Sequence, residues 1–323
     1  MPTTSGTRLQ KNLLDMRILV TGGRGMVGKN LLEQVDSGSH EVFAPTKLEL
    51  DLTDAVGTVD WMKKHEPDLV IHAAAVVGGI QANINEPVRF LIDNIEVSRN
   101  VILAARKTGV NKLINIGASC MYPRFGQNPL REESIQSGDL EPTNEPFAIA
   151  KIFSMRLCEY IQRENPNFNF KTVIPCNLYG RHDTFDNVKS HLLPAIITKL
   201  HQAKKTGEMS VEIWGPGTAR REFMYAADFC EFLWLAVEKF DTLPIRMNVG
   251  VGYDMSVNEY YELVASVVGY RGSFCNRLDK PVGMKRKLVD IEKLAAWGWS
   301  AKTSLRDGVQ RTYDYFLETN ENV

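Results

Sequence analysis

Short apolar runs alternate with longer amphipathic stretches along the first half of the chain. The runs have the length of buried strands and lie at residues 17–20, 41–44, 69–74, 112–117 and 170–175. Apolar positions recur at helical spacing in the stretches between them, at residues 56–65, 90–107 and 147–164. Strands that alternate with helices predict βαβ units and a parallel sheet. The pattern therefore indicates an α/β domain with a doubly wound parallel sheet.

This alternation weakens after about residue 175. The remaining segments are of mixed type and lie at residues 192–204, 211–215, 228–240 and 257–268, with a last helix expected near 305–317 after Ser304, which can cap it. They predict a smaller mixed α/β lobe and a substrate cleft between the two lobes. We expect a disordered leader at 1–15, a nucleotide-binding domain at 16–180 and a substrate lobe at 181–323, some segments of which return to the first domain.

Composition excludes several classes of protein. The 323 residues are 44% hydrophobic and 24% charged with a net charge of −1, so nothing predicts a nucleic-acid partner. No stretch has the length and apolarity of a membrane span. The cysteines are odd in number and lack the paired spacing of a metal site or a disulfide framework: Cys120, Cys158, Cys176, Cys230 and Cys275. We therefore expect a cytoplasmic protein without a metal.

A glycine-rich turn follows the first apolar run and precedes a helical pattern. Glycines at 22, 25 and 28 permit a tight turn, close approach of backbone N–H groups to a pyrophosphate, and close packing of helix on strand. Taken alone, the turn is also compatible with an ordinary strand-to-helix connection. The strands and helices that follow favour a Rossmann-type domain, with cofactor contacts expected at Gly22, Arg24, Gly25, Met26, Val27 and Gly28.

The end of the second apolar run indicates which dinucleotide is bound. No Asp or Glu stands there to accept hydrogen bonds from an adenosine ribose, whereas Lys47 lies nearby and Arg24 lies within the glycine turn. Cations at this place favour the 2′-phosphate of NADP over NAD. Lys47 is equally well explained as a solvated surface lysine. Asp51 and Leu52, a few residues on, are candidates to contact the adenine.

Several further motifs carry a resemblance to a known family. They are GGRGMVG at 22–28, AAVVGG at 74–79, SCMYP at 119–123, LEPTNE at 140–145, NLYGRHD at 177–183, WGPGT at 214–218 and REF at 221–223. In this order they resemble the extended short-chain dehydrogenases/reductases, and among these the GDP-L-fucose synthase family of GDP-4-keto-6-deoxymannose epimerase/reductases. The resemblance extends over residues 16–315. It implies NADP(H), a homodimer formed through residues 90–107 and 147–164, and further cofactor contacts at Ala74, Ala75, Lys151, Pro175, Asn177 and Leu178.

The resemblance implies two reactions at one site. A cysteine thiolate removes the protons at C3 and C5 of the sugar, a histidine returns a proton, and hydride from NADPH then reduces the C4 ketone. The two proton-exchanging positions correspond to Cys120 and His182. Thiol and imidazole titrate near enough to neutrality for this task. Outside these motifs, Cys120 would be taken for a buried small hydrophobe and His182 for a loop histidine.

The chain departs from the family at the reductive triad of Ser, Tyr and Lys. Those positions correspond to Ala118, Phe147 and Lys151. A phenyl ring has no proton to give to the C4 alkoxide, and losing a positioned donor costs about 3 kcal/mol or more of transition-state stabilisation. We therefore expect reduction to be lost or severely impaired, whether the substitutions are natural or introduced. Lys151 can still hold the nicotinamide ribose.

Epimerisation also places negative charge on the C4 oxygen, so another group must stabilise it. The candidates are Ser119, the backbone, a water and the field of Lys151. Tyr122 is a conceivable proton source, although a packed aromatic in the turn after the strand is the better interpretation. The sequence does not choose among these groups.

The substrate side is inferred from the same resemblance. The expected contacts to a GDP-4-keto-6-deoxy sugar are Ser119, Asn177, Ser190, Trp214, Arg221 and Lys287. Arg221 has the fork geometry that suits pyrophosphate oxygens. Lys287 lies in a basic run, which is as readily explained by a solvated face. Val282 stands where relatives often have Asp.

Three hypotheses follow. The leading one is a GDP-sugar epimerase that acts at C3, C5 or both, with reduction lost. The first alternative is a bifunctional NADPH-dependent epimerase/reductase that uses another proton donor. The second alternative is a degenerate dinucleotide-binding scaffold without catalysis, against which the retained Cys120 and His182 argue.

Overall fold

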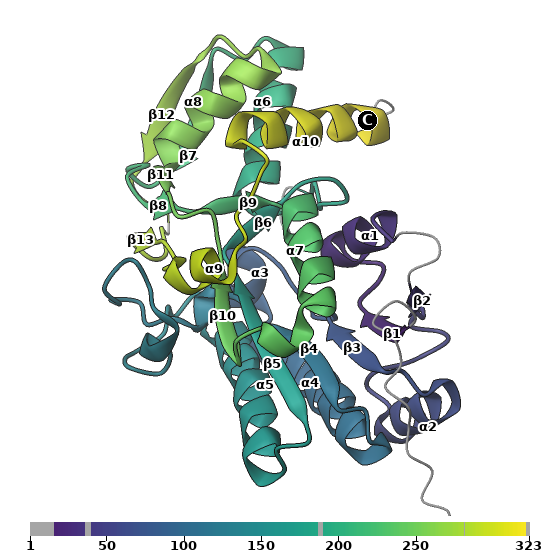
Figure 1. Ribbon diagram of the computed structural model, residues 1–323. Helices are drawn as coiled ribbons and strands as arrows, with labels where there is room; N and C mark the ends of the chain where they lie inside the picture. The colour runs from purple at the N-terminus through teal and green to yellow at the C-terminus, as the bar shows by residue number, and fades with distance from the viewer. Residues whose placement is uncertain (1–15, 36–39, 187–189, 281, 321–323) are drawn as a thin grey trace, which may run out of the picture.

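A six-stranded parallel sheet forms the centre of the molecule in the computed structural model, which describes residues 16–35, 40–186, 190–280 and 282–320 (Figure 1). Its order is β10-β5-β4-β3-β1-β2. The strands are β1 (Met16–Thr21), β2 (His40–Phe43), β3 (Leu69–His72), β4 (Lys112–Ile116), β5 (Asn169–Pro175) and β10 (Arg246–Val249). This confirms the expected Rossmann-type fold. The expected leader at 1–15 lies outside the described residues.

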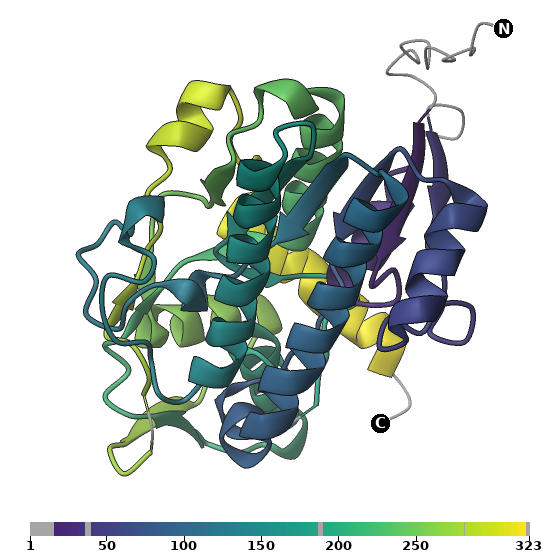
Figure 2. The ribbon, with the colours of Figure 1, turned by 90° about the horizontal axis from the view of Figure 1, so that it is seen from below.

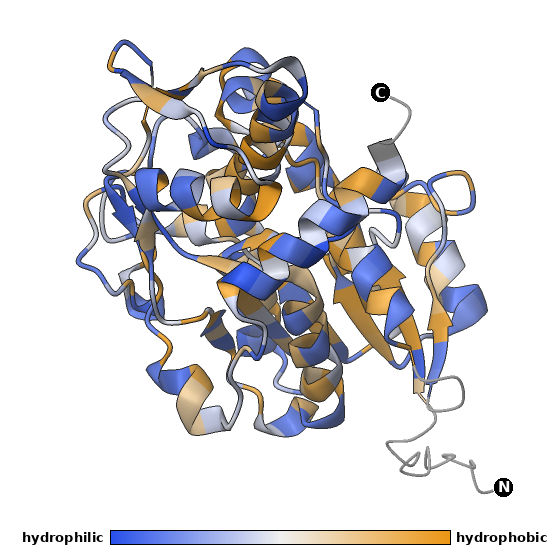
Figure 3. Ribbon diagram, turned by 90° about the horizontal axis from the view of Figure 1, so that it is seen from above, coloured by the Kyte–Doolittle hydropathy of each residue, from blue (hydrophilic) through white to orange (hydrophobic). Residues whose placement is uncertain are grey.

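Helices cover both faces of this sheet because alternate strand residues point to opposite sides. On one face, α2 (Ala55–His65), α4 (Pro87–Thr108) and α5 (Glu145–Glu164) pack on residues such as Leu19 and Val70. On the other face, α1 (Met26–Glu33) and α7 (Ala226–Glu238) pack on Ile18 and Val20. Figure 2 shows α4 and α5 running side by side, and Figure 3 shows the apolar character of the strands between the layers.

Two late segments, the strand β10 and the helix α7, belong to the domain of this sheet. β10 pairs with β5 in parallel, with Arg246 opposite Thr172. The segment expected at 228–240 in the smaller lobe is α7, and it packs on α1 instead. Trp234 Nε1 donates a hydrogen bond to Leu31 O at 3.0 Å, which joins the two helices. The physical reason is that α1 alone does not cover its face of the sheet, and the strongly apolar α7 completes it.

The smaller lobe is mixed α/β, as expected. Its helices are α6 (Leu192–Thr206), α8 (Val257–Val268) and α10 (Leu305–Asn320), and its strands are β6 (Asn177–Tyr179), β7 (Ser210–Trp214), β8 (Arg220–Arg221), β9 (Phe223–Tyr225), β11 (Met255–Ser256), β12 (Ser273–Arg277) and β13 (Arg286–Lys287). Short helices complete the chain: α3 (Ile80–Asn85), α9 (Glu292–Trp297), η1 (Ser119–Met121), η2 (Glu132–Ser134) and η3 (Phe240–Thr242). Ser304 Oγ accepts a hydrogen bond from Asp307 N at 3.2 Å, so the expected cap of α10 is confirmed.

A buried carboxylate joins the lobe to the sheet. Glu222 lies between β8 and β9 and is fully buried. Its Oε1 accepts from Val251 N at 2.7 Å and Gly252 N at 2.9 Å, which follow β10, and its Oε2 accepts from Val289 N at 2.9 Å, which follows β13. Burial raises the pKa of Glu222 to about 6, and the amide bonds oppose that rise.

Candidate functional site

The glycine turn has room for an anion at the start of α1. A Cβ on Gly22, whose φ is +74°, would lie 2.7 Å from Ala74 N, and one on Gly28 would lie 2.2 Å from Gly22 O, so both glycines serve internal packing. A Cβ on Gly25 would meet its nearest atom only at 3.5 Å. Gly25 precedes the first turn of α1 and offers no side-chain cap. These features fit a pyrophosphate beside the helix N-terminus.

The two candidate phosphate-binding cations lie at the surface near this turn. Arg24 and Lys47 are both exposed, and Lys47 Nζ is 4.0 Å from the carboxylate of Asp51. Hydrogen bonds from Thr53 lower the pKa of Asp51. Asn100 was not expected from the sequence, yet its Nδ2 donates to Leu52 O at 2.9 Å and so holds the segment that follows Asp51. The positive charges of Arg24 and Lys47 fit a 2′-phosphate, as the sequence predicts.

Cys120 lies in η1, directly beyond the carboxyl end of β4. Its residue is 6% exposed. Burial raises the pKa of the thiol, while the positive charges of Lys287 and Lys151 lower it. The fold thus brings the charges of Lys151 and Lys287 close enough to act on Cys120, although Lys287 lies 167 positions away in the sequence.

Lys151 lies on α5 with Phe147 one turn before it. Its Nζ donates a hydrogen bond to Ile116 O at 2.8 Å and lies 5.6 Å from the centroid of the Phe147 ring. Burial lowers the pKa of Lys151 to about 8, with the Cys120 thiolate opposing. Ala118 lies between β4 and η1. Neither Ala118 nor Phe147 carries a proton donor in its side chain.

Two cations lie next to each other at the entrance from the smaller lobe. Lys287 in β13 is in register with Arg221 in β8. Arg221 Nη2 donates to Val282 O at 3.2 Å, and among the described residues no hydrogen bond or ion pair holds Lys287 Nζ. Burial and Arg221 lower the pKa of Lys287 to about 8. Glu141, 4% exposed, lies near both cations and forms an ion pair with Arg124 at 3.2 Å.

A hollow of about 180 Å³ adjoins this pair, with Gly283 beside Arg221. It is lined by Arg124, Phe125, Thr218, Ala219, Val282, Gly283 and Lys285. Val282 packs against Gly215, next to Trp214, whose exposed ring lies 5.8 Å from Lys280 Nζ. Val282, where the family resemblance leads us to expect Asp, is therefore packed against the backbone of Gly215.

The remaining predicted contact residues bond within the protein. Asn177 Nδ2 donates to Glu222 O at 2.7 Å, and Ser190 Oγ donates to Thr184 O at 2.6 Å. Ser119, 5% exposed, belongs to η1 with Cys120. Ala74 follows β3 and donates its N–H to Thr21 Oγ1 at 3.2 Å, beside the glycine turn. Pro175 ends β5 and Ala75 follows β3, so both lie at the carboxyl edge of the sheet, and Leu178 lies in β6, the next strand along the chain.

Comparison with known proteins agrees with this geometry. Residues 18–250 match the NAD dependent epimerase/dehydratase family. The chain belongs to this family. GDP-L-colitose synthase of Yersinia pseudotuberculosis is 48% identical over 307 residues, which cover 95% of this chain and 100% of that one. GDP-L-fucose synthase of Azorhizobium caulinodans is 50% identical over 305 residues, which cover 94% and 97%.

A solved structure of the family shares the whole fold. GDP-D-glycero-L-gluco-heptose synthase of Campylobacter jejuni, crystallised in the presence of NADPH, superimposes with a TM-score of 0.86 at 30% identity and covers 94% of this chain and 98% of its own. The relatives are GDP-sugar synthases of the epimerase/reductase type, and this chain is an enzyme of that type. In its described residues no helix is long and apolar enough to cross a membrane.

Two histidines, His182 and His191, have different surroundings in the structure. His182, at φ +63°, has its Nδ1 3.0 Å from Tyr315 Oη and its Nε2 2.6 Å from Glu33 Oε1, and none of its described contacts is with Cys120. His191, directly before α6, was not singled out from the sequence. Burial by the surrounding protein and the charge of Lys287 lower its pKa. Lys287 thus acts electrostatically on both His191 and Cys120.

His72 is a second residue that sequence reasoning missed. It is fully buried at the end of β3, with Nδ1 2.9 Å from Thr21 Oγ1 and Nε2 3.2 Å from Ser98 Oγ. Burial lowers its pKa to about 3, so it is neutral at physiological pH. A histidine at the end of an otherwise apolar strand was the signal available. Through Thr21 it supports the strand end that leads into the glycine turn.

Proposed function

We propose that this protein is an epimerase acting at C3, C5 or both of a GDP-4-keto-6-deoxy sugar, with reduction of the C4 ketone lost. NADP(H) is its cofactor, and the open space at Gly25 with the nearby cations fits it. One observation carries the proposal: the phenyl ring of Phe147 stands one turn before the buried Lys151, where the family's reductive donor is expected. Cys120 remains in place near two lysines.

The chain's own groups account for the proton transfers. The Cys120 thiolate takes a proton from the carbon next to the ketone and becomes a thiol, and the electron pair moves to the C4 oxygen. The charges of Lys287 and Lys151 stabilise both the thiolate and that oxygen. A protonated histidine then gives its proton to the opposite face of the carbon and becomes neutral. Bound NADPH would supply hydride to C4 in a reductive step.

We assign the returning proton to His191 and keep His182 as the alternative that the sequence suggested. Both ring nitrogens of His182 are engaged by Glu33 and Tyr315, whereas His191 shares the charge of Lys287 with Cys120. His191→Asn and His182→Asn separate the two. The first is expected to reduce the epimerisation rate by about 100-fold or more, and the second to reduce it less. Equal rates for His191→Asn and the unchanged protein would return the role to His182.

Deuterium exchange tests the function itself. The protein is incubated with GDP-4-keto-6-deoxymannose and NADPH in deuterated buffer, carbon-bound deuterium is followed by NMR, and NADPH by absorbance. The expected result is deuterium at C3 or C5 without loss of NADPH, and none with Cys120→Ser. Stoichiometric NADPH loss would instead establish a bifunctional epimerase/reductase with another proton donor. Neither signal would leave the non-catalytic scaffold or another substrate.

The same proposal covers assembly and compartment. Exposed apolar side chains lie on the paired helices α4 and α5, namely Val88, Ile92, Ile149 and Tyr160. They support a homodimer in which these helices pack against their copies. All five cysteines are free, which supports a reducing cytoplasm.

A further inference from the structure

A buried asparagine bonds to three segments of the chain, one of which follows Cys120. Asn248, on β10, is fully buried. Its Oδ1 accepts a hydrogen bond from the hydroxyl of Tyr122, and its Nδ2 donates to Leu130 O at 2.9 Å and to Asp290 O at 3.1 Å. Its backbone N–H donates to Glu132 Oε1 at 2.9 Å. The side-chain amide therefore has all its hydrogens bonded and is held in one orientation.

Two of the three segments carry the groups assigned to chemistry. Tyr122, also fully buried, comes two residues after Cys120, and Asp290 comes three residues after Lys287. The third segment is bonded to the second, because Leu130 N donates to Leu288 O at 2.8 Å and Asp290 N donates to Leu130 O at 2.9 Å. Asn248 thus connects the turn that bears the thiol to the strand that bears the ammonium.

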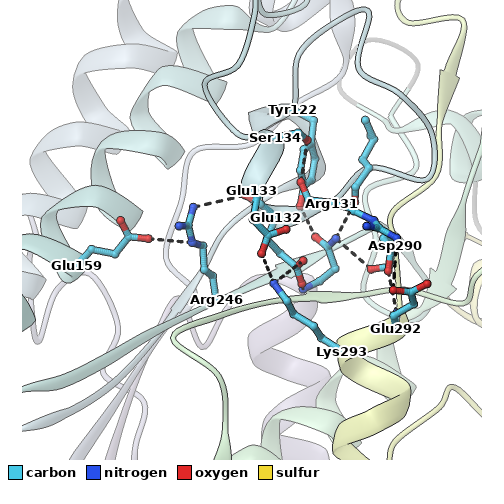
Figure 4. A network of polar contacts seen from close by, with 12 residues as sticks. Tyr122, Arg131, Glu132, Glu133, Ser134, Glu159, Arg246, Asp290, Glu292 and Lys293 are labelled. Atoms are coloured by element: carbon cyan, nitrogen blue, oxygen red, sulfur yellow. Dashed lines mark hydrogen bonds and ion pairs between the residues drawn. The ribbon is translucent and has the colours of Figure 1, made fainter.

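Ion pairs surround this network (Figure 4). Glu132, 3% exposed, is 3.0 Å from Lys293 Nζ, and Arg131 Nε is 3.2 Å from Asp290 Oδ2. Arg246 joins it to α5 through Glu159 at 3.3 Å. None of these ion pairs includes Cys120 or Lys287, so these charged groups hold the network and do not contact the reacting pair.

We propose that Asn248 and Tyr122 are positioning residues that hold Cys120 and Lys287 at a fixed separation. The inference rests on the proposed function, in which the thiolate is the base. The interaction between a thiolate and an ammonium decreases as their distance grows, so a shift of the turn weakens it. The side chains of Ala118 and Phe147 carry no hydroxyl for the C4 oxygen, so the proposed reaction depends on that charge.

Several charged groups act on Cys120 and Lys287. Cys120 has Lys287 and Lys151 as charged neighbours. Lys287 is faced in addition by Arg221, Cys176 and Glu141, and it acts on His191. Of these elements, the network bonds the segments that follow Cys120 and Lys287, so its loss changes their separation first.

Alkylation of Cys120 as a function of pH tests the role without substrate. The full-length protein is treated with iodoacetamide from pH 6 to 10, and peptide mass spectrometry reports Cys120 beside the exposed Cys275 as an internal reference. Tyr122→Phe is expected to raise the midpoint for Cys120 by about half a pH unit or more while that of Cys275 stays. Asn248→Leu is expected to raise it further. Tyr179→Phe is the matched control, since its buried hydroxyl bonds to Leu305 O at 3.3 Å in the other lobe.

Deuterium exchange gives the catalytic readout. Tyr122→Phe is expected to lower kcat about 3-fold or more with KM nearly unchanged, whereas Tyr179→Phe leaves both. The inference is overturned when Tyr122→Phe keeps the Cys120 profile of the unchanged protein while losing as much thermal stability as Tyr179→Phe. This outcome remains measurable when Asn248→Leu does not fold. Absence of any exchange in the unchanged protein would overturn the proposed function separately.

Discussion

The proposed function depends on two side chains that carry no proton donor. Phe147 lies one turn before Lys151, and Ala118 lies at the end of β4 beside Cys120. We expect the double substitution Ala118→Ser with Phe147→Tyr to raise the rate of NADPH oxidation by about 100-fold or more, because it restores two donors to the C4 oxygen. The measurement is loss of NADPH absorbance with the keto sugar.

A matched control for this gain is Phe153→Tyr, which adds a hydroxyl elsewhere on α5. It is expected to leave NADPH oxidation at the level of the unchanged protein. Equal rates in the double variant and this control would contradict the proposal that Phe147 and Ala118 remove the reductive step.

The residues of the site differ in how far sequence alone could find them. Cys120 and Lys287 came from motif and resemblance, and the fold brings their charges within reach of each other. His191 was missed because a histidine's partner depends on how the loop before α6 folds, which spacing does not reveal. Asn248 was missed for a related reason: its partners lie 126, 118 and 42 residues away in sequence.

At the scale of elements, the glycine turn separates packing from binding. A Cβ on Gly28 would lie 2.2 Å from Gly22 O, so Gly28→Ala is expected to cost about 1–3 kcal/mol of unfolding free energy. Gly25 has φ −79° and an open side-chain direction, so Gly25→Ala is expected to keep stability within about 0.5 kcal/mol. It is nevertheless expected to weaken NADPH binding by about tenfold or more, because the methyl group occupies the phosphate's place.

Urea unfolding and fluorescence titration with NADPH provide the two readings. Unchanged NADPH affinity in a folded Gly25→Ala protein would contradict a pyrophosphate at this helix N-terminus.

Elements with long, regular patterns were predicted well. The strands expected at 41–44, 112–117 and 170–175 correspond to β2, β4 and β5, and the helices expected at 56–65 and 147–164 to α2 and α5. β10 was not predicted, because Asn248 interrupts its apolar run. The segment at 228–240 was grouped with the smaller lobe without saying which segments return to the first domain. It forms α7 on the first domain, and periodicity alone does not identify the surface that an apolar segment covers.

At the scale of the whole molecule, stability is expected to depend on pH through His72. Its pKa is about 3 in the folded protein against 6.5 when unfolded, so the folded state excludes a proton that the unfolded state binds. Its contribution is fully present above pH 6.5 and is lost as the pH falls from there toward 3. Between pH 6.5 and 5 the loss is about 2 kcal/mol.

Urea unfolding at pH 7.5 and pH 5 checks this dependence. His72→Gln, which keeps hydrogen-bonding groups but does not titrate, is expected to lose about 2 kcal/mol less on acidification than the unchanged protein. The same loss in both would assign the acid sensitivity to other groups.

The exposed apolar residues of α4 and α5 lead to a prediction on assembly. Val88 and Ile92 are exposed and lie one turn apart on α4. Figure 2 shows that α4 runs side by side with α5. Ile92→Glu is expected to convert a homodimer to a monomer, because a charge would be buried between apolar helices. Light scattering after size-exclusion chromatography measures the mass, with Val56→Glu on α2 as the exposed control. A monomer before substitution would contradict the dimer.

The hydrogen bonds of Glu222 also make the opening of the junction between the lobes measurable by amide hydrogen exchange. Its three backbone partners, Val251, Gly252 and Val289, keep their N–H groups covered as long as the bonds hold. Amide hydrogens of this kind exchange with solvent only when the structure around them opens. Exchange at Val251 and Gly252, which follow β10 of the sheet, therefore reports how often the smaller lobe detaches from the sheet, and the measurement needs no substrate.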